Sequence, residues 1–253
     1  MHFREATISA AFEQHRRKYA SGERGWDVPH HIEMWQTARR AFEEPSFEDF
    51  ERLYRELKSR WQVFRGAKAH WTARQSFERL RSLDPRYGTR RLSTLGDSEL
   101  GDLWLLLEAM PDVKTNKYGP SVVAVSKFLH FWNPKLFVIV DYGVIWSFVL
   151  EHGWLWRSYE AARKDVDQRI FGKAQRHSDE TCDLRSYLAI LAWAGRLARD
   201  NPGIMERFAE HVGRNRGDAQ LPPGLSHYDG AAVEWFLLGV VEISPPGIGQ
   251  AST

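Results

Sequence analysis

Three polar side chains stand in a mostly apolar stretch, and their types suit acid–base chemistry or the stabilisation of a positive charge. Lys127 and His130 are three residues apart, so they share one face of the predicted helix SVVAVSKFLHFW. Asp141 follows the apolar run LFVIV, at the expected start of a further helix. The helix dipole and free N–H groups at that end favour a carboxylate. Lys127, His130 and Asp141 are therefore candidate catalytic residues, while Asp141 could instead act only as a helix cap.

The elements that must position these side chains form a helix–loop–helix over residues 119–150. Gly119 lets the backbone turn sharply, the proline after it fits a first helical turn, and Ser121 can help to cap the helix. An Asn-Pro pair at 133–134 ends this helix. The apolar run at 136–140 is either a strand or an extended segment inside a helical core.

The rest of the chain shows helical spacing of apolar residues and no repeats, which predicts a mainly α fold of roughly ten amphipathic helices around this central element. We expect one domain over 1–243, with a possible division into lobes at 1–110 and 111–243, and a disordered tail at 244–253. The other predicted helices cover about 4–20, 30–43, 46–61, 68–83, 97–110, 154–170, 181–199, 202–212 and 231–243.

The composition is that of an ordinary globular protein, with 43% hydrophobic and 27% charged residues. Eleven Trp and 14 Phe predict an aromatic-rich core. Cys182 is the single cysteine, so no internal disulfide can form, and no apolar run is long enough for a signal peptide or a membrane span. We therefore expect a cytoplasmic protein without a membrane partner. His30, His31 and Glu33 lack further ligands at metal-site spacing, so we predict no metal and no cofactor.

A basic stripe runs through residues 58–91, with ten Lys or Arg against two acidic residues and several interleaved aromatics. Such a pattern suits phosphate contacts combined with base stacking, so DNA is a possible partner. The other interpretation is a solvated helix face balanced by the acid-rich stretch at 43–56. The candidate nucleic-acid contacts in the stripe are Arg65, Lys68, Arg74, Arg90 and Arg91.

The order of a Gly turn, a helix, a Pro, an apolar extended run and an Asp at a helix start resembles the helix-hairpin-helix DNA glycosylase superfamily. Gly119 matches the first hairpin glycine, Pro134 the loop proline, and Asp141 the catalytic aspartate. The resemblance implies hydrolysis of an N-glycosidic bond on a flipped-out base. Asp141 would stabilise the sugar cation, and Gly119 and Ser121 would hold DNA phosphate. The same string is similar to one in uncharacterised all-helical bacterial proteins, which implies no activity.

The chain also departs from that family pattern. Ser121 replaces the second hairpin glycine, no proline precedes Asp141 directly, and Val123 stands where lyase-type members carry a lysine. Lys127 comes one helical turn later, and there are no four cysteines for an iron–sulfur cluster. The alternative function is a non-catalytic helical module that binds nucleic acid or protein.

Overall fold

The computed structural model describes residues 1–19, 27–63, 72–110, 115–116, 119–141, 153–172, 182–241 and 243. These residues contain eleven α-helices, three 3₁₀ helices and one pair of two-residue strands, which confirms the mainly α fold. None of the helices in these segments is both long and apolar enough to cross a membrane.

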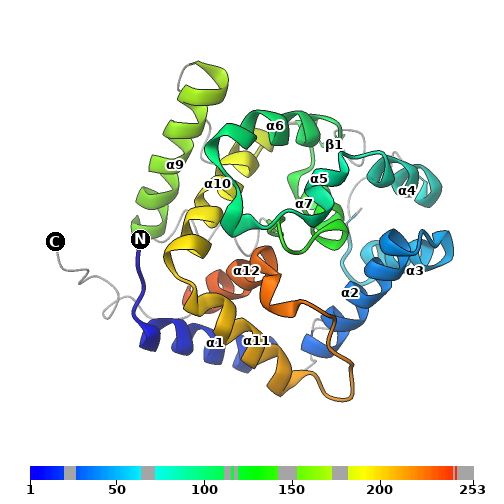
Figure 1. Ribbon diagram of the computed structural model, residues 1–253, viewed down its shortest axis with the longest axis horizontal. Coiled ribbons are helices and arrows are strands. Elements are labelled where there is room, and N and C mark those ends of the chain that lie inside the picture. Colours follow the sequence, from blue (N-terminus) through cyan, green and yellow to red (C-terminus); the bar gives the residue numbers. More distant parts are fainter. Residues whose placement is uncertain are drawn as a thin grey trace.

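The helices and strands of the described segments are labelled in Figure 1. The α-helices are α1 (Glu5–Tyr19), α2 (Val28–Glu43), α3 (Phe47–Ser59), α4 (Ala73–Arg81), α5 (Pro85–Thr89), α6 (Leu100–Glu108), α7 (Val122–Trp132), α9 (Gly153–Phe171), α10 (Leu184–Asp200), α11 (Gly203–Asn215) and α12 (Asp229–Val240). The shorter elements are η1 (Leu92–Thr94), η2 (Asp97–Glu99), η5 (Leu225–His227), β1 (Thr115–Asn116) and β2 (Gly119–Pro120).

Side-chain caps decide where several helices begin. Ser46 caps α3 as expected, accepting a hydrogen bond from the backbone N–H of Asp49 at 3.2 Å. Elsewhere the caps move the predicted starts. Asp27 caps α2, which therefore begins two residues before position 30. Thr72 forms a capping box that starts α4, later than the predicted 68, and Asp183 starts α10 later than the predicted 181.

The first and last helices of the described chain lie against each other. In Figure 1, α1 and α11 lie side by side along one edge of the molecule, and α12 packs on both. The contact between α1 and α12 is so close that a Cβ atom on Gly239 would lie 1.9 Å from the carbonyl oxygen of Ala11. A residue with a side chain at position 239 would therefore push α1 away from α12.

The first helical turn was predicted at Pro120, two residues before the observed start of α7. Gly119 and Pro120 form strand β2, which pairs antiparallel with β1, and α7 begins at Val122 with Ser121 in the cap position. The Ser121 side chain makes no capping hydrogen bond. The turn that the glycine was expected to make is thus replaced by a short extended pair.

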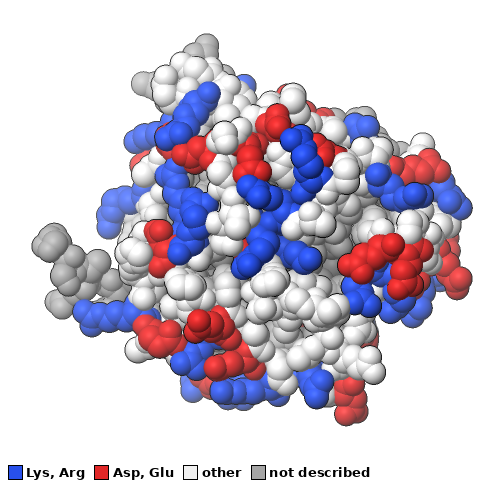
Figure 2. All heavy atoms as spheres, viewed as in Figure 1, with Lys and Arg blue, Asp and Glu red and all other residues white. Residues whose placement is uncertain are grey.

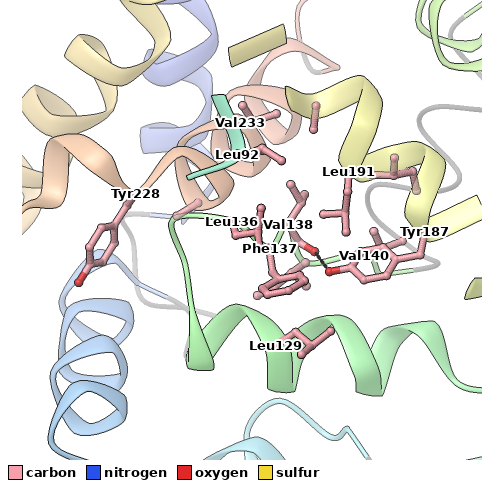
Figure 3. Close-up of a cluster of buried hydrophobic side chains, with 14 of the residues drawn as sticks. Leu92, Leu129, Leu136, Phe137, Val138, Val140, Tyr187, Leu191, Tyr228 and Val233 are labelled. Carbon is pink, nitrogen blue, oxygen red and sulfur yellow. Dashed lines mark hydrogen bonds between the residues drawn. The ribbon is translucent and has the colours of Figure 1, made fainter. Parts of the chain in front are cut away.

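The run at 136–140 is an extended segment inside a helical core rather than a strand. All five of its side chains are buried. Figure 3 shows the segment passing above α7, with Tyr187 and Leu191 of α10 and Val233 of α12 on its other side. It belongs to one connected cluster of buried side chains that extends from Ile8 to Val240. Trp35, Trp193 and Trp235 are among the largest side chains in that cluster, which confirms the aromatic-rich core.

Candidate functional site

A buried extended segment has no neighbouring strand to pair its backbone groups, so other groups must do so. Four polar side chains serve 136–140. The Tyr187 hydroxyl donates to the carbonyl of Val138 at 2.9 Å, and the backbone N–H of Val140 donates to Ser126 Oγ at 3.1 Å. His130 and Glu234 supply the remaining two contacts, one to Phe137 and one to Ile139.

His130, a predicted catalytic residue, has both of its ring nitrogens hydrogen-bonded within the core. Its Nε2 accepts from the indole N–H of Trp35 at 3.2 Å, so the ring proton is on Nδ1, which donates to the carbonyl of Phe137 at 2.8 Å. Burial lowers the pKa of His130 to about 4, so the ring is neutral at neutral pH. The residue is fully buried and positions the chain that leads to Asp141.

Lys127 lies one turn earlier on α7 and faces a pocket instead. The pocket has an empty volume of ≈ 510 Å³, which includes space open to solvent at its mouth. The pocket is lined by His15, Tyr19, Val28, His31, Trp61, Lys127, Ile139, Asp141, Glu234, Trp235 and Leu238.

Two of the three predicted catalytic residues converge at this pocket. Lys127 Nζ lies 3.1 Å from Oδ2 of Asp141 and donates to the carbonyl of Trp61 at 3.4 Å. The side chain of Lys127 is 3% exposed and that of Asp141 is 29% exposed. The ammonium group is therefore held inside the protein, with the carboxylate between it and the solvent.

Glu234 is a second carboxyl group in the pocket, and the sequence did not single it out. Its Oε2 accepts a weak hydrogen bond from the backbone N–H of Ile139 at 3.3 Å. Burial raises the pKa of Glu234 to about 8, against the opposing effects of that N–H and of Lys127. Its side chain is thus mainly the neutral acid at pH 7. The available signal was an acidic residue in the middle of the otherwise apolar run AAVEWFLL, in a helix that is buried throughout.

Aromatic and imidazole rings form the remaining walls of the pocket. The His15 ring stacks on Trp235 with centroids 4.6 Å apart, and His31 meets Trp61 and Trp235 edge-on at 4.9 and 5.3 Å. Burial lowers the pKa of His31 to about 3 and that of His15 well below its usual value. Both rings are therefore neutral. Such walls suit a flat, unsaturated ring.

The side chains of His30 and His31 face different surroundings. His31 faces the pocket, whereas Nδ1 of His30 lies 2.9 Å from the guanidinium of Arg60. Over the described segments, no three His, Cys, Asp or Glu side chains are grouped so that they could hold a metal ion.

The described arginines of the basic stripe make contacts within the protein. Arg91 Nη2 lies 2.8 Å from the buried carboxylate of Asp229 at the start of α12. Arg90 pairs with Glu99, and the Arg74 guanidinium lies 3.5 Å from the ring centroid of Phe47. These contacts hold neighbouring elements together and leave the side chains partly or fully exposed.

The other predicted phosphate contacts are buried, lie in a strand or fall outside the described residues. Ser121 is buried, and Gly119 belongs to β2. Arg65 and Lys68 lie outside the described residues. Figure 2 shows basic and acidic side chains side by side over the face in view, rather than one continuous basic surface.

A scan of protein-family models, a search of curated proteins and a search of solved structures found no match to this chain. The interpretation of the pocket therefore depends on its own residues.

Proposed function

We propose that the protein hydrolyses an N-glycosidic bond, with Glu234 as the general acid and Asp141 as the carboxylate that faces the developing sugar cation. The observation that carries this proposal is the placement of two carboxyl groups in unlike surroundings within one pocket. Glu234 is buried, which raises its pKa to about 8, and Asp141 is a partly exposed carboxylate paired with Lys127. A buried carboxyl group that keeps its proton, beside a second carboxylate, forms a typical acid–base set.

In this reaction Glu234 donates its proton to the leaving base as the bond between the sugar carbon and the base nitrogen breaks. The bonding electron pair leaves with the base, and the positive charge on the sugar is stabilised by Asp141. Water then adds to the sugar carbon and returns a proton to the Glu234 carboxylate. The neutral acid is restored, and the sum of the steps is hydrolysis.

Lys127 acts on Asp141 rather than on the sugar. Its ammonium group, fixed by Asp141 and the carbonyl of Trp61, holds the carboxylate in one orientation. The positive charge of Lys127 repels the developing sugar cation, so Lys127 cannot stabilise that cation directly. Lys127 is therefore a positioning residue in the proposal.

DNA is the proposed substrate because about residues 117–149 resemble the helix-hairpin-helix DNA glycosylases and because the pocket walls are aromatic. A flipped-out base would stack between rings such as Trp61 and Trp235.

The test is release of free base from duplex DNA that carries a panel of damaged bases. Glu234→Gln keeps the shape of the side chain and removes the acid, and loss of a general acid lowers the rate by about 10²–10⁴-fold. Asp141→Asn should lower it as well. Glu206→Gln on the exposed face of α11 is the matched control and should leave the rate unchanged. Base release by Glu234→Gln at the wild-type rate would refute the assignment.

Binding measurements separate substrate recognition from chemistry. We expect tighter binding to a duplex with an abasic-site analogue than to undamaged duplex or single strand, weakening steeply with salt. Equal and weak binding to all three would indicate only a generic basic surface.

The second candidate function is a non-catalytic helical module, and the ion pair between Asp141 and the buried Lys127, which a purely structural role explains, favours it. In that case Asp141→Asn removes this ion pair and costs roughly 1–3 kcal/mol of stability, because Lys127 is buried, with no activity to lose. The base-release assay on the same variant distinguishes the two candidates.

A further inference from the structure

His15 and His211 join two cavities that are otherwise separated by packed side chains. His15 on α1 lines the pocket that holds Glu234 and Asp141. His211 on α11 lines a separate cleft between α1 and α11, whose other walls include Arg16 and Arg214. His15 Nδ1 and His211 Nε2 lie 3.1 Å apart, within hydrogen-bonding distance, and both side chains are buried.

We propose that this histidine pair is a proton relay between the cleft at α11 and the buried pocket. The inference builds on the proposed function, because it assigns the route by which the acid in the pocket exchanges its proton with solvent. Two imidazole rings suit such a route, since each carries one proton and one lone pair when neutral.

The transfer is balanced as follows. At the start, His211 Nε2–H donates to the lone pair of His15 Nδ1, and His15 carries its proton on Nε2. A proton from solvent adds to His211 Nδ1, the shared proton moves to His15 Nδ1, and His15 releases its Nε2 proton into the pocket. One proton has moved inward, both rings are neutral again, and the shared hydrogen bond is reversed. A proton that moves outward restores the first arrangement.

The environment of the pair keeps both rings neutral between transfers. Burial is the first cause that lowers the pKa of His211 to about 4, with Arg16 and Arg214 acting in the same direction and Glu13 against them. The pKa of His15 is lowered by burial and by His211, His31 and Lys18. Glu234, beside Trp235 on α12, and Asp141 are the acidic groups that share the pocket with His15.

Tight packing fixes the geometry of the relay. Trp235 stacks on His15 and meets His211 edge-on, with centroids 5.7 Å apart in the second case. Phe12 covers His211 from α1 at 5.6 Å. Neither ring has room to turn freely, so the hydrogen bond between them persists.

The experiment measures exchange of the His15 ring proton with water by NMR on histidine labelled with ¹⁵N, without any substrate. Buried ring protons that lack a path to solvent exchange slowly. The wild-type His15 ring proton should exchange at least tenfold faster than the Nδ1 proton of His130, a buried imidazole that donates to the carbonyl of Phe137. An equal or slower rate in the wild type would overturn the relay, whatever the variants do.

The variant His211→Gln keeps a polar side chain at the position but cannot pass a proton on, so exchange at His15 should slow at least tenfold. Ser9→Ala in the same cleft is the control, because it changes no charge near His211, and it should leave the exchange rate unchanged. In His211→Ala, added imidazole should restore exchange through the cleft. An unchanged rate in a folded His211→Gln protein would refute the relay. Because no base release is measured, this result is independent of the proposed reaction.

Discussion

Lys127 and His130 lie one turn apart on α7, yet they belong to two regions with opposite properties. His130 belongs to the set of side chains that satisfies the backbone of 136–140, and both its ring nitrogens are engaged with buried partners. Lys127 belongs to the pocket, where its ammonium group meets a partly exposed carboxylate. The distinction therefore comes from what each side chain faces and not from its type or spacing.

The two regions show how to separate structural from chemical polar groups in a buried setting. Around 136–140 each polar side chain has a fixed backbone partner, and removing it leaves that partner unpaired. In the pocket the polar groups face a space that water or a ligand can enter. Glu234 belongs to both regions, because it accepts from Ile139 and also lines the pocket. Substitutions in the first region should mainly change stability, and those in the second mainly activity.

The largest expected stability effect in this comparison is that of His130→Ala. The change leaves the carbonyl of Phe137 and the indole N–H of Trp35 without partners and opens a cavity, which together cost roughly 3–5 kcal/mol. Chemical denaturation monitored by circular dichroism measures the free energy of unfolding.

Lys127→Met on the same helix is the matched substitution for that prediction. A methionine of similar length fills the space, and the partner carboxylate is partly exposed, so stability should stay within about 1 kcal/mol. A larger loss for Lys127→Met than for His130→Ala would reverse the assignment of the two residues.

The next effect concerns pH. The pKa of Glu234 is raised by folding from 4.5 to about 8, so the folded state binds the extra proton and stability falls as pH rises across that window. The buried histidines have lowered pKa values, about 4 for His130 and His211, so they remove stability as pH falls below 6.5. Stability should therefore be greatest near pH 6.5 and should decline toward pH 8 by up to about 1.4 kcal/mol per unit.

Glu234→Gln isolates the contribution of the acid, because the amide does not titrate. The decline between pH 6.5 and pH 8 should disappear in this variant, while the loss of stability at lower pH should remain. A wild-type profile in Glu234→Gln would show that another group causes the alkaline decline.

A smaller loss than that of His130→Ala is predicted for Tyr187→Phe, whose hydrogen bond is drawn in Figure 3. The change removes one hydroxyl and leaves the buried carbonyl of Val138 unpaired, which costs about 1–2 kcal/mol. Tyr87→Phe is the control, because that hydroxyl is less buried and donates only weakly to Glu99 at 3.4 Å. Thermal unfolding of both variants compares the two losses, and an equal loss would contradict the role assigned to Tyr187.

Local patterns in the sequence predicted much of the fold. Apolar spacing placed the helices, and Ser46 was correctly identified as a cap, because both signals act within a few residues. The extended character of 136–140 was one of the two expected forms. Lys127 and Asp141 were both candidate residues. They meet in the structure, although 14 residues separate them, because the intervening segment folds back on α7.

The rest of the pocket could not be predicted because its walls are far apart in the chain. His15 on α1, Trp61 just after α3 and Trp235 on α12 meet only through tertiary packing. Glu234 was not recognised as a site residue, because a pattern of apolar residues over a whole helix gives little weight to one acidic residue within it. His130 was assigned to the site because its spacing from Lys127 is helical, whereas the direction of its ring is set by Trp35 and Phe137.

The close contact between α1 and α12 also has a consequence for synthesis on the ribosome. His15 is made early, but its stacking partner Trp235 and the neighbouring acid are made roughly 220 residues later, about 10–45 s at typical translation rates. During that interval the apolar face of α1 has no α12 to cover it. The apolar face of α1 therefore waits for α11 and α12, which are both made late, and the pocket is completed only when α12 has left the exit tunnel.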